Sequence, residues 1–191
     1  MAGPITNPAN GHSYYLLGPS TWTRAESDAV SLGGHLVTIN DGEENEWVRV
    51  NVLGFDGADR RGWIGFNDVA SEGTFAWSSG ETSTYTNWNG GEPNNSGGVE
   101  HYTEMFGSGT GLWNDQPDAP IGLSVYGIVE ITPTPTCPAD FNGSGSVTVQ
   151  DIFDFLSAYF ENNVAADFNE SGTVTVQDIF DFLNAYFAGC P

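Results

Sequence analysis

The feature that most constrains this chain is a segment that occurs twice near its end. Residues 139–160 and 166–187 differ at three of 22 positions and are offset by 27 residues. Identity of this degree marks a duplicated supersecondary unit. Each copy runs from a polar, glycine-containing loop into an apolar stretch at helical spacing. Thr148 can N-cap the first of these helices, with Asp151 completing a capping box, so the repeat predicts two loop–helix units of one design.

Each repeat opens with a twelve-residue loop that carries oxygen-bearing side chains at alternating positions. Glycine stands at position 6, where such a loop turns sharply, and position 12 is a carboxylate. This is the ligand spacing of an EF-hand calcium loop. The predicted calcium ligands are Asp140, Asn142, Ser144, Ser146 and Asp151 in the first loop, and Asp167, Asn169, Ser171, Thr173 and Asp178 in the second. The alternative is a duplicated helical hairpin whose loops are turns without metal.

Two such units with Asp at position 12 resemble the dockerin type I module, over residues 137–191. The resemblance implies a small all-α module of two EF-hand-like repeats that docks onto a cohesin-like partner protein. Surplus apolar residues on each helix, such as Phe153 and Phe160, fit a partner surface, and burial against the rest of the chain is the alternative. Cys137 and Cys190 flank the module, where a disulfide would join its ends in an oxidising compartment, and two free thiols are the alternative.

A Thr/Pro run after Ile131 divides the chain, because alternating Thr and Pro favour an extended spacer. The predicted organisation is a first domain over residues 1–131, a linker over 132–136 and the repeat module over 137–191. All four basic residues, which are arginines, and 17 acids precede Cys137, so the first part carries −13. Eight acids and no basic residue follow it, so the module carries −8.

The resulting net charge of −21 excludes several classes of partner. A chain without lysine is not expected to bind a nucleic acid backbone or an anionic membrane surface. No apolar run is long enough for membrane insertion, and the first residues show no leader pattern. Folding so many carboxylates together calls for counter-ions, and divalent cations such as Ca²⁺ are the first expectation.

The first domain has the pattern of an α+β fold. Thr21 or Thr23 can cap a helix that runs to Leu32, and Asp41 can open a second helix over residues 42–53. Short strands are expected at residues 13–17, 63–66, 74–77 and 126–131, with a long region rich in Gly, Asn and Trp among them. Two helices with short antiparallel strands and long loops are therefore predicted.

An ordered set of short motifs in this domain is more specific than any one of them. In chain order the set is Gly33–Ile39, Glu44-Asn45, Trp63–Asp68, Phe75–Trp77, Asn87-Trp88, Gly91–Asn94 and Trp113–Asp115. The set resembles the C-type lectin-like domain over about residues 10–131. The resemblance implies that calcium and a sugar share one site, formed by Glu92, Asn94, Glu100, Asn114 and Asp115. Two neighbouring sugar hydroxyls would complete the metal shell, each also bonded by a Glu carboxylate and an Asn amide.

The chemistry of these five residues agrees with the resemblance, since they offer three carboxylates and two amide oxygens to a cation that prefers oxygen. A cis peptide bond at Pro93 would aim Glu92 and Asn94 the same way. Glu-Pro-Asn is the family's arrangement for mannose-, glucose-, N-acetylglucosamine- or fucose-type hydroxyl pairs. The alternative is that these residues only form turns and local caps and bind no metal.

The resemblance also has departures. Asp68, Glu72, Asn95 and the shared Glu100 match the family's auxiliary calcium site, but His101 stands where that site usually has an acid. The cysteines expected at Ala29, Tyr102, Asp118 and Val129 are missing. Their absence fits the disulfide-free versions of this fold in bacterial extracellular proteins.

No nucleophile motif, phosphate-binding loop or zinc pattern is present, so the chain is not expected to be an enzyme. The sequence instead predicts a secreted or cell-surface, calcium-dependent carbohydrate-binding protein with an anchoring module. The rival is an extracellular adhesion module that contacts protein and uses calcium only structurally.

Overall fold

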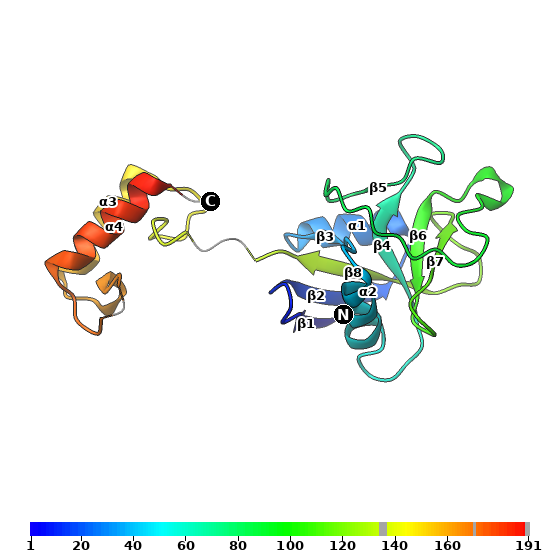
Figure 1. The fold of residues 1–191 in the computed structure, drawn as a ribbon, viewed down its shortest axis with the longest axis horizontal. Helices are drawn as coiled ribbons and strands as arrows, with labels where there is room; N and C mark the ends of the chain where they lie inside the picture. The colour runs from blue at the N-terminus through cyan, green and yellow to red at the C-terminus, as the bar shows by residue number, and fades with distance from the viewer. Residues whose placement is uncertain (134–136, 170, 190–191) are drawn as a thin grey trace. The chain divides into compact units, whose positions relative to one another are not determined.

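The structure, a computed structural model, describes residues 1–133, 137–169 and 171–189, and it separates into two compact units (Figure 1). The first unit comprises residues 1–132 and the second residues 133–191. Most of the predicted linker lies outside the described residues, and so does Cys190 of the predicted disulfide. Cys137 is described and is not a free thiol. Among the described helices, none combines the length and the apolar character that a bilayer crossing needs.

One mixed sheet forms the frame of the first unit. Its strands are β1 (Ala2–Thr6), β2 (Ser13–Pro19), β3 (His35–Leu36), β4 (Arg61–Asn67), β5 (Ala76–Trp77), β6 (Tyr102–Phe106), β7 (Trp113–Gln116) and β8 (Val125–Ile131). The main order is β1-β2-β8-β4-β6-β7, with β3 added to β8 and β5 to β4. The expectation of antiparallel strands was wrong for β4 and β8, which pair in parallel from Arg61 and Val125. Parallel pairing needs a long return path, which the loop-rich segment between these strands supplies.

Two helices accompany the sheet, and both begin at capping residues that the sequence indicated. The side chain of Thr21 accepts the Arg24 N–H at the start of α1 (Trp22–Ser31). Asp41 accepts the Glu44 N–H at the start of α2 (Gly42–Val48). The predicted second helix does not continue as one α-helix, because Arg49–Leu53 forms a π-helical turn. Each cap satisfies a backbone donor that would otherwise have no partner.

Aromatic side chains dominate the core of the first unit. Trp113 is fully buried, and its ring meets those of Trp77, Tyr85 and Trp88 edge to face at 5.8–5.9 Å between centroids. Its Nε1 donates to Asn45 Oδ1 at 2.8 Å, so α2 is fastened to β7. Edge-to-face aromatic pairs stabilise beyond their buried area, and this core forms directly beneath the strand that carries Asn114 and Asp115.

The second unit consists of two helices, α3 (Val149–Phe160) and α4 (Val176–Ala188), with a 3₁₀ turn at Val164–Ala166. Phe155 and Phe182 are fully buried and stack with parallel rings, 4.2 Å between centroids. Both helices begin with a capping box, Thr148 with Asp151 and Thr175 with Asp178. The predicted cap at Thr148 is confirmed, and the core of this unit is small and built from equivalent positions of the two repeats.

Candidate functional site

The segment between β5 and β6 carries the Glu-Pro-Asn motif and folds back onto β7. The Glu92–Pro93 peptide is cis, and the Asn94 side-chain amide donates to the Glu92 carboxylate. The backbone N–H groups of Asn94 and Asn95 both donate to the Asp115 carboxylate, at 3.1 and 2.7 Å. Asp115 is almost completely buried. The motif is therefore held against β7 by a carboxylate that the sequence also named as a calcium ligand.

Glu100 closes the same loop from its other end. Its Oε2 accepts the Ser96 N–H at 2.7 Å, and its own N–H donates to Asn95 Oδ1 at 3.0 Å. Asn95 adopts a left-handed backbone conformation, with φ of 43°, which asparagine tolerates better than most residues. Four of the five predicted ligands thus gather in this loop and on the adjoining strand.

The electrostatics of the gathered carboxylates favour a cation. Desolvation and the charge of Asp115 raise the pKa of Glu92, whose carboxyl lies within hydrogen-bonding reach of Asp115. Desolvation also raises the pKa of Glu100, with Asp115 adding to the shift and the Ser96 N–H opposing it. Within the described part of the chain, no Arg or His forms an ion pair with these three carboxylates. Carboxylates that repel one another and have amide oxygens beside them are a set of oxygen ligands that fits Ca²⁺.

Asn114, the fifth predicted ligand, makes its hydrogen bond elsewhere. Its Nδ2 donates to Glu104 Oε1 at 3.4 Å, across the β6–β7 ladder that pairs the two residues. The same oxygen accepts Arg61 Nη1 at 2.6 Å and Gln116 Nε2 at 3.1 Å. Glu104 is fully buried, and its Oε2 has no hydrogen-bond partner among the described residues. Burial raises the pKa of Glu104, and Arg61 opposes that shift.

Glu104 is the residue of this site that the sequence analysis missed. The only signal was an acid between Thr103 and Met105, in a stretch that the structure shows to be a buried strand. An acid at such a position needs a cationic partner, and with four arginines in the chain few candidates exist. Because the amide of Asn114 donates to Glu104, its Oδ1 is left as the atom able to accept or to bind a metal.

The residues of the predicted auxiliary site separate into two groups. Asp68 and Glu72 lie close to His101, with Asp68 Oδ1 at 3.1 Å and Glu72 Oε2 at 3.4 Å from His101 Nδ1. Asn95 instead uses its Oδ1 within the loop described above, where it accepts the Glu100 N–H. The structure therefore assembles two of the four predicted ligands around an imidazole.

The two loops of the second unit have the same internal hydrogen bonds. Asp140 accepts the Ser144 and Gly145 N–H groups at 2.9 and 2.7 Å, and Asp167 accepts the equivalent donors at the same distances. Gly145 and Gly172 have φ of 85° and 88°, the left-handed region that favours glycine. Two independent copies of one sequence thus form the same turn, with glycine at the position where the loop pattern requires it.

The last residue of each loop is buried at the start of its helix. Asp151 accepts the Asn142 and Thr148 N–H groups at 3.2 and 2.7 Å, and Asp178 is bonded in the same way. Burial opposes ionisation of Asp151, but these hydrogen bonds bring its pKa below the ordinary value. Asn142 and Asn169 donate their side-chain amides to Asp154 and Asp181, which the sequence analysis did not single out. The remaining predicted ligands bond within each loop: Ser144 Oγ donates to the Ser146 carbonyl, and Ser171 Oγ to the Thr173 carbonyl.

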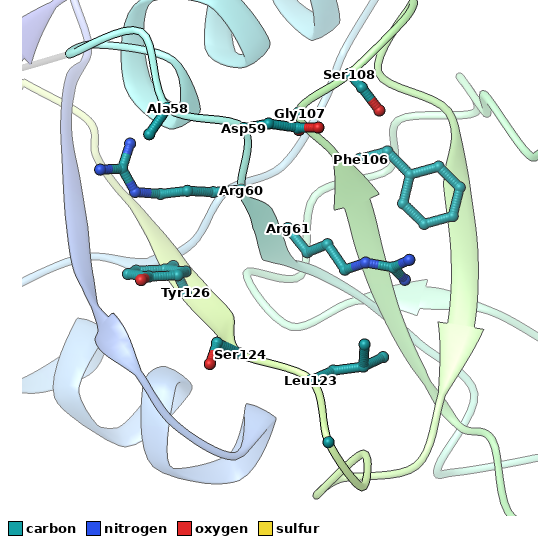
Figure 2. A pocket seen from close by; sticks show the side chains of 11 residues that line it. Ala58, Asp59, Arg60, Arg61, Phe106, Gly107, Ser108, Leu123, Ser124 and Tyr126 are labelled. Carbon is teal, nitrogen blue, oxygen red and sulfur yellow. The ribbon is translucent and has the colours of Figure 1, made fainter.

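A cavity of about 640 Å³ lies at the ends of β4 and β6 away from these ligands, and none of the predicted ligands lines it (Figure 2). Arg60 and Arg61 enter it in different directions, Arg60 beside Tyr126 and Arg61 toward Phe106. Arg60 is bound by Asp56 through two hydrogen bonds of 2.7 and 2.6 Å, and Arg61 by Glu104. With their charges matched by carboxylates, these arginines do not form a basic surface.

Comparison with known proteins places the first unit among lectins. The family model described as Lectin C-type domain matches residues 18–120, and the second unit lies outside this match. The low affinity immunoglobulin epsilon Fc receptor of Mus musculus is 38% identical over 102 residues, which are 53% of this chain and 29% of the relative. The galactose-specific lectin nattectin of Thalassophryne nattereri is 33% identical over 98 residues, which are 51% of this chain and 61% of the relative. The chain thus spans less than two thirds of the length of either relative.

Solved structures give the same result. The C-type lectin CEL-I from Cucumaria echinata superposes with a TM-score of 0.58 and 26% identity, covering 68% of this chain and 91% of that one. The carbohydrate-recognition domain of cow CD23 was crystallised in the presence of GlcNAc2Man3 oligosaccharide. It superposes with a TM-score of 0.55 and 30% sequence identity, covering 63% of this chain and 88% of that one. Nearly the whole of each of these domains is matched, so the α+β architecture of the first unit is that of these lectins.

Proposed function

Because the chain belongs to the C-type lectin domain family, we propose that its first unit is a calcium-dependent carbohydrate-binding domain whose sugar site is the Glu92–Asn94 loop with Glu100, Asn114 and Asp115. The observation that carries the proposal is the convergence of Glu92, Glu100 and Asp115, none of which forms an ion pair with an Arg or His in the described part of the chain. The lectin relatives are non-enzymatic carbohydrate-binding proteins, so the first unit is a binding domain and not an enzyme.

In this proposal the chain supplies the polar groups that a sugar hydroxyl needs. The Glu92 and Glu100 carboxylates accept hydrogen bonds from hydroxyl groups, and the Asn94 and Asn114 amides donate to hydroxyl oxygens. Asp115 fixes the loop through the backbone of Asn94 and Asn95. A calcium ion bound there would supply positive charge and open coordination positions for two neighbouring hydroxyls.

We propose that the preferred sugars are of the mannose, glucose, N-acetylglucosamine or fucose type. The support is the order of acid and amide in Glu92-Pro93-Asn94, which the family resemblance associates with those hydroxyl pairs. The cow CD23 domain was crystallised with a mannose-containing oligosaccharide, whereas nattectin is named as galactose-specific. Relatives are thus associated with both kinds of sugar, and we assign the preference of this chain to the order of acid and amide in its own loop.

For the second unit we propose a dockerin-like, calcium-binding module that anchors the protein to a cohesin-like partner outside the cell. The repeated hydrogen-bond pattern of its two loops supports two equivalent calcium sites. Phe153 and Phe180 are 62% and 58% exposed, and Phe160 and Phe187 are both 80% exposed. Large apolar side chains at equivalent positions of both helices support a contact surface for a protein partner. The lack of the usual lectin cysteines supports an origin among bacterial extracellular proteins.

A second candidate is protein recognition by the first unit, with calcium serving only to hold the loops. The specific observation in its favour is that a relative with 38% identity is named as a receptor for an immunoglobulin Fc region. In that case the carboxylates of the Glu92 loop order the surface without touching a sugar.

The experiment that separates the two candidates exchanges acid and amide in the motif. The double variant Glu92→Gln, Asn94→Asp should keep calcium and shift binding on a glycan array toward galactose-type sugars, because the exchange reverses which group donates to each hydroxyl. The array is run with Ca²⁺ and with EDTA, and the exchange leaves the net charge of the chain unchanged, so a shift of sugar preference is not an effect of net charge. Calcium binding with no glycan bound by either protein would favour the protein-recognition function.

A further inference from the structure

Two carboxylates and an imidazole meet where β4 ends and β6 begins. Asp68 follows β4, Glu72 lies in the turn after it, and His101 immediately precedes β6. The ligating atoms of the three side chains all lie within 4.8 Å of one another. His101 Nδ1 is 3.1 Å from Asp68 Oδ1 and 3.4 Å from Glu72 Oε2. The imidazole therefore faces both carboxylates with one nitrogen.

The backbone holds this cluster in place. The Asp68 N–H donates to the His101 carbonyl at 3.1 Å, continuing the pairing of β4 with β6. Asp68 is 2% exposed, and its Oδ2 accepts the Gly73 N–H at 2.7 Å, which fixes the orientation of the carboxylate. Its other oxygen faces His101. Glu72 and His101 keep 55% and 35% of their side-chain surface exposed, so an ion can reach the cluster from solvent.

This donor set does not fit the auxiliary calcium predicted from the sequence. Ca²⁺ takes six to eight oxygen ligands, and here an imidazole nitrogen stands where the family resemblance expects an acid. Asn95 and Glu100, which were to complete the shell, accept backbone N–H groups within their own loop. Two carboxylates and a nitrogen remain.

We propose that Asp68, Glu72 and His101 form a site for a divalent transition metal of the zinc class, distinct from the calcium sites. Zinc accepts imidazole and carboxylate together, and three protein ligands leave the fourth tetrahedral position to water. Tetrahedral bonds of about 2.0–2.1 Å separate neighbouring ligand atoms by roughly 3.3–3.4 Å. The separations of 3.1 and 3.4 Å around His101 Nδ1 match this geometry.

A second cluster of His and Glu side chains in the same unit differs, because hydrogen-bond donors already occupy its carboxylate oxygens. His12, Glu44 and Glu130 also approach one another, but Tyr14 Oη donates within 2.6 Å of Glu44 and lies 3.0 Å from Glu130. Backbone N–H groups of Asn40 and Thr38 occupy the other carboxylate oxygens. That cluster is a completed hydrogen-bond network in the core, whereas among the described residues only one of the four carboxylate oxygens of Asp68 and Glu72 accepts a backbone hydrogen bond.

The test is calorimetric titration of the metal-stripped full chain with ZnCl₂ in buffer that keeps the calcium sites saturated. We expect one zinc per chain. Affinity should fall at least about tenfold in His101→Ala, and also in His101→Asp, because each removes the nitrogen ligand. His35→Gln, which removes an imidazole near Glu81 and Glu130, should bind as the parent does. Co²⁺ should give the intense visible absorption of a tetrahedral site in the parent and lose it in both His101 variants.

Three results would overturn the proposal. Absence of zinc uptake by the calcium-saturated parent would show that the three side chains contact one another without forming a metal site. Unchanged zinc affinity in both His101 variants would place any zinc elsewhere, and loss in His35→Gln would assign it to the His35 group. Tryptophan fluorescence of each variant verifies that the first unit is folded, and glycan binding by His101→Asp tests separately whether the sugar site is intact.

Discussion

The two units of this chain present carboxylates in opposite ways. In the first unit the predicted ligands are scattered from Glu92 to Asp115 and are brought together by β7, a long loop and an aromatic core around Trp113. In the second unit each ligand set occupies twelve consecutive residues, and the core is little more than two stacked phenylalanines with their neighbours. In the first unit the fold brings the ligands together. In the second unit we expect calcium bound by the loops to stabilise the fold.

This contrast predicts that metal removal affects the second unit most. Chelation should unfold α3 and α4, because each loop then crowds two carboxylates next to a helix start without a cation. Two sites contribute roughly 5 kcal/mol at a hundredfold excess of Ca²⁺ over Kd, about 2.7 kcal/mol each. All six tryptophans lie in the first unit, so a loss of helical circular dichroism without a shift of tryptophan fluorescence identifies the second unit. Calorimetry that finds one shared calcium site, or none, would contradict the paired-loop prediction.

Chelation should lower the stability of the first unit by less than that of the second unit. One principal calcium contributes about 2.7 kcal/mol under the same excess, and the buried core remains when it is lost. We expect the tryptophan-detected melting temperature to fall in EDTA while the unit stays folded at room temperature. Asp115→Asn should show the lowered melting temperature with and without chelator. A melting temperature that does not change in EDTA would contradict both the calcium site and the sugar-binding mechanism that depends on it.

Glu104 tests whether positioning by the fold matters at the sugar site. Glu104→Gln keeps the shape but weakens the hold on Asn114, so calcium affinity should fall a few-fold. Stability should fall by about 1–2 kcal/mol, because Arg61 is 39% exposed and water can solvate its unpaired charge. Calcium titration of the variant gives the first quantity and thermal melting the second. Glu81→Gln serves as the charge control, and an equal loss of affinity there would reduce the effect to net charge.

The smallest predicted difference is in the response to acid. Burial and the charge of Asp115 raise the pKa of Glu92, so protons compete with calcium there at a higher pH than they would at an ordinary glutamate. Backbone hydrogen bonds lower the pKa of Asp151 and Asp178, so these carboxylates stay ionised to a lower pH. As pH falls, the first unit should release calcium before the second, relative to the affinity of each site at neutral pH. Tryptophan fluorescence and helical circular dichroism follow the two releases, and the reverse order would refute the assignment.

Local signals in the sequence predicted the local structure well. Thr21, Asp41 and Thr148 were identified as capping candidates from side-chain chemistry alone, and each caps a helix. The strands β6 and β7 were not predicted, because their short stretches carry Thr, Glu, Asn and Asp and do not alternate cleanly between polar and apolar. Their identity depends on pairing with each other, which is a long-range property.

The same limit applies to the site. The ordered motifs named the residues of the Glu92 loop, since their spacing is local and specific. The link from Asn114 through Glu104 to Arg61 depends on the register of three strands, which no single segment encodes. The meeting of Asp68 with His101 likewise follows from the pairing of β4 with β6.

The strand order of the first unit also determines how it carries a load. The chain leaves this unit at the end of β8, which lies between β2 and β4, while the Glu92 loop is fastened to β7 at the sheet edge. A pull on residues beyond Ile131, against a ligand held by that loop, passes from β7 through β6 and β4 to β8. The β7–β6 and β6–β4 ladders are antiparallel, whereas the β4–β8 ladder is parallel, with slanted hydrogen bonds that are slightly less stable per residue. We therefore expect the β4–β8 ladder to be the first of the three to open under such a load.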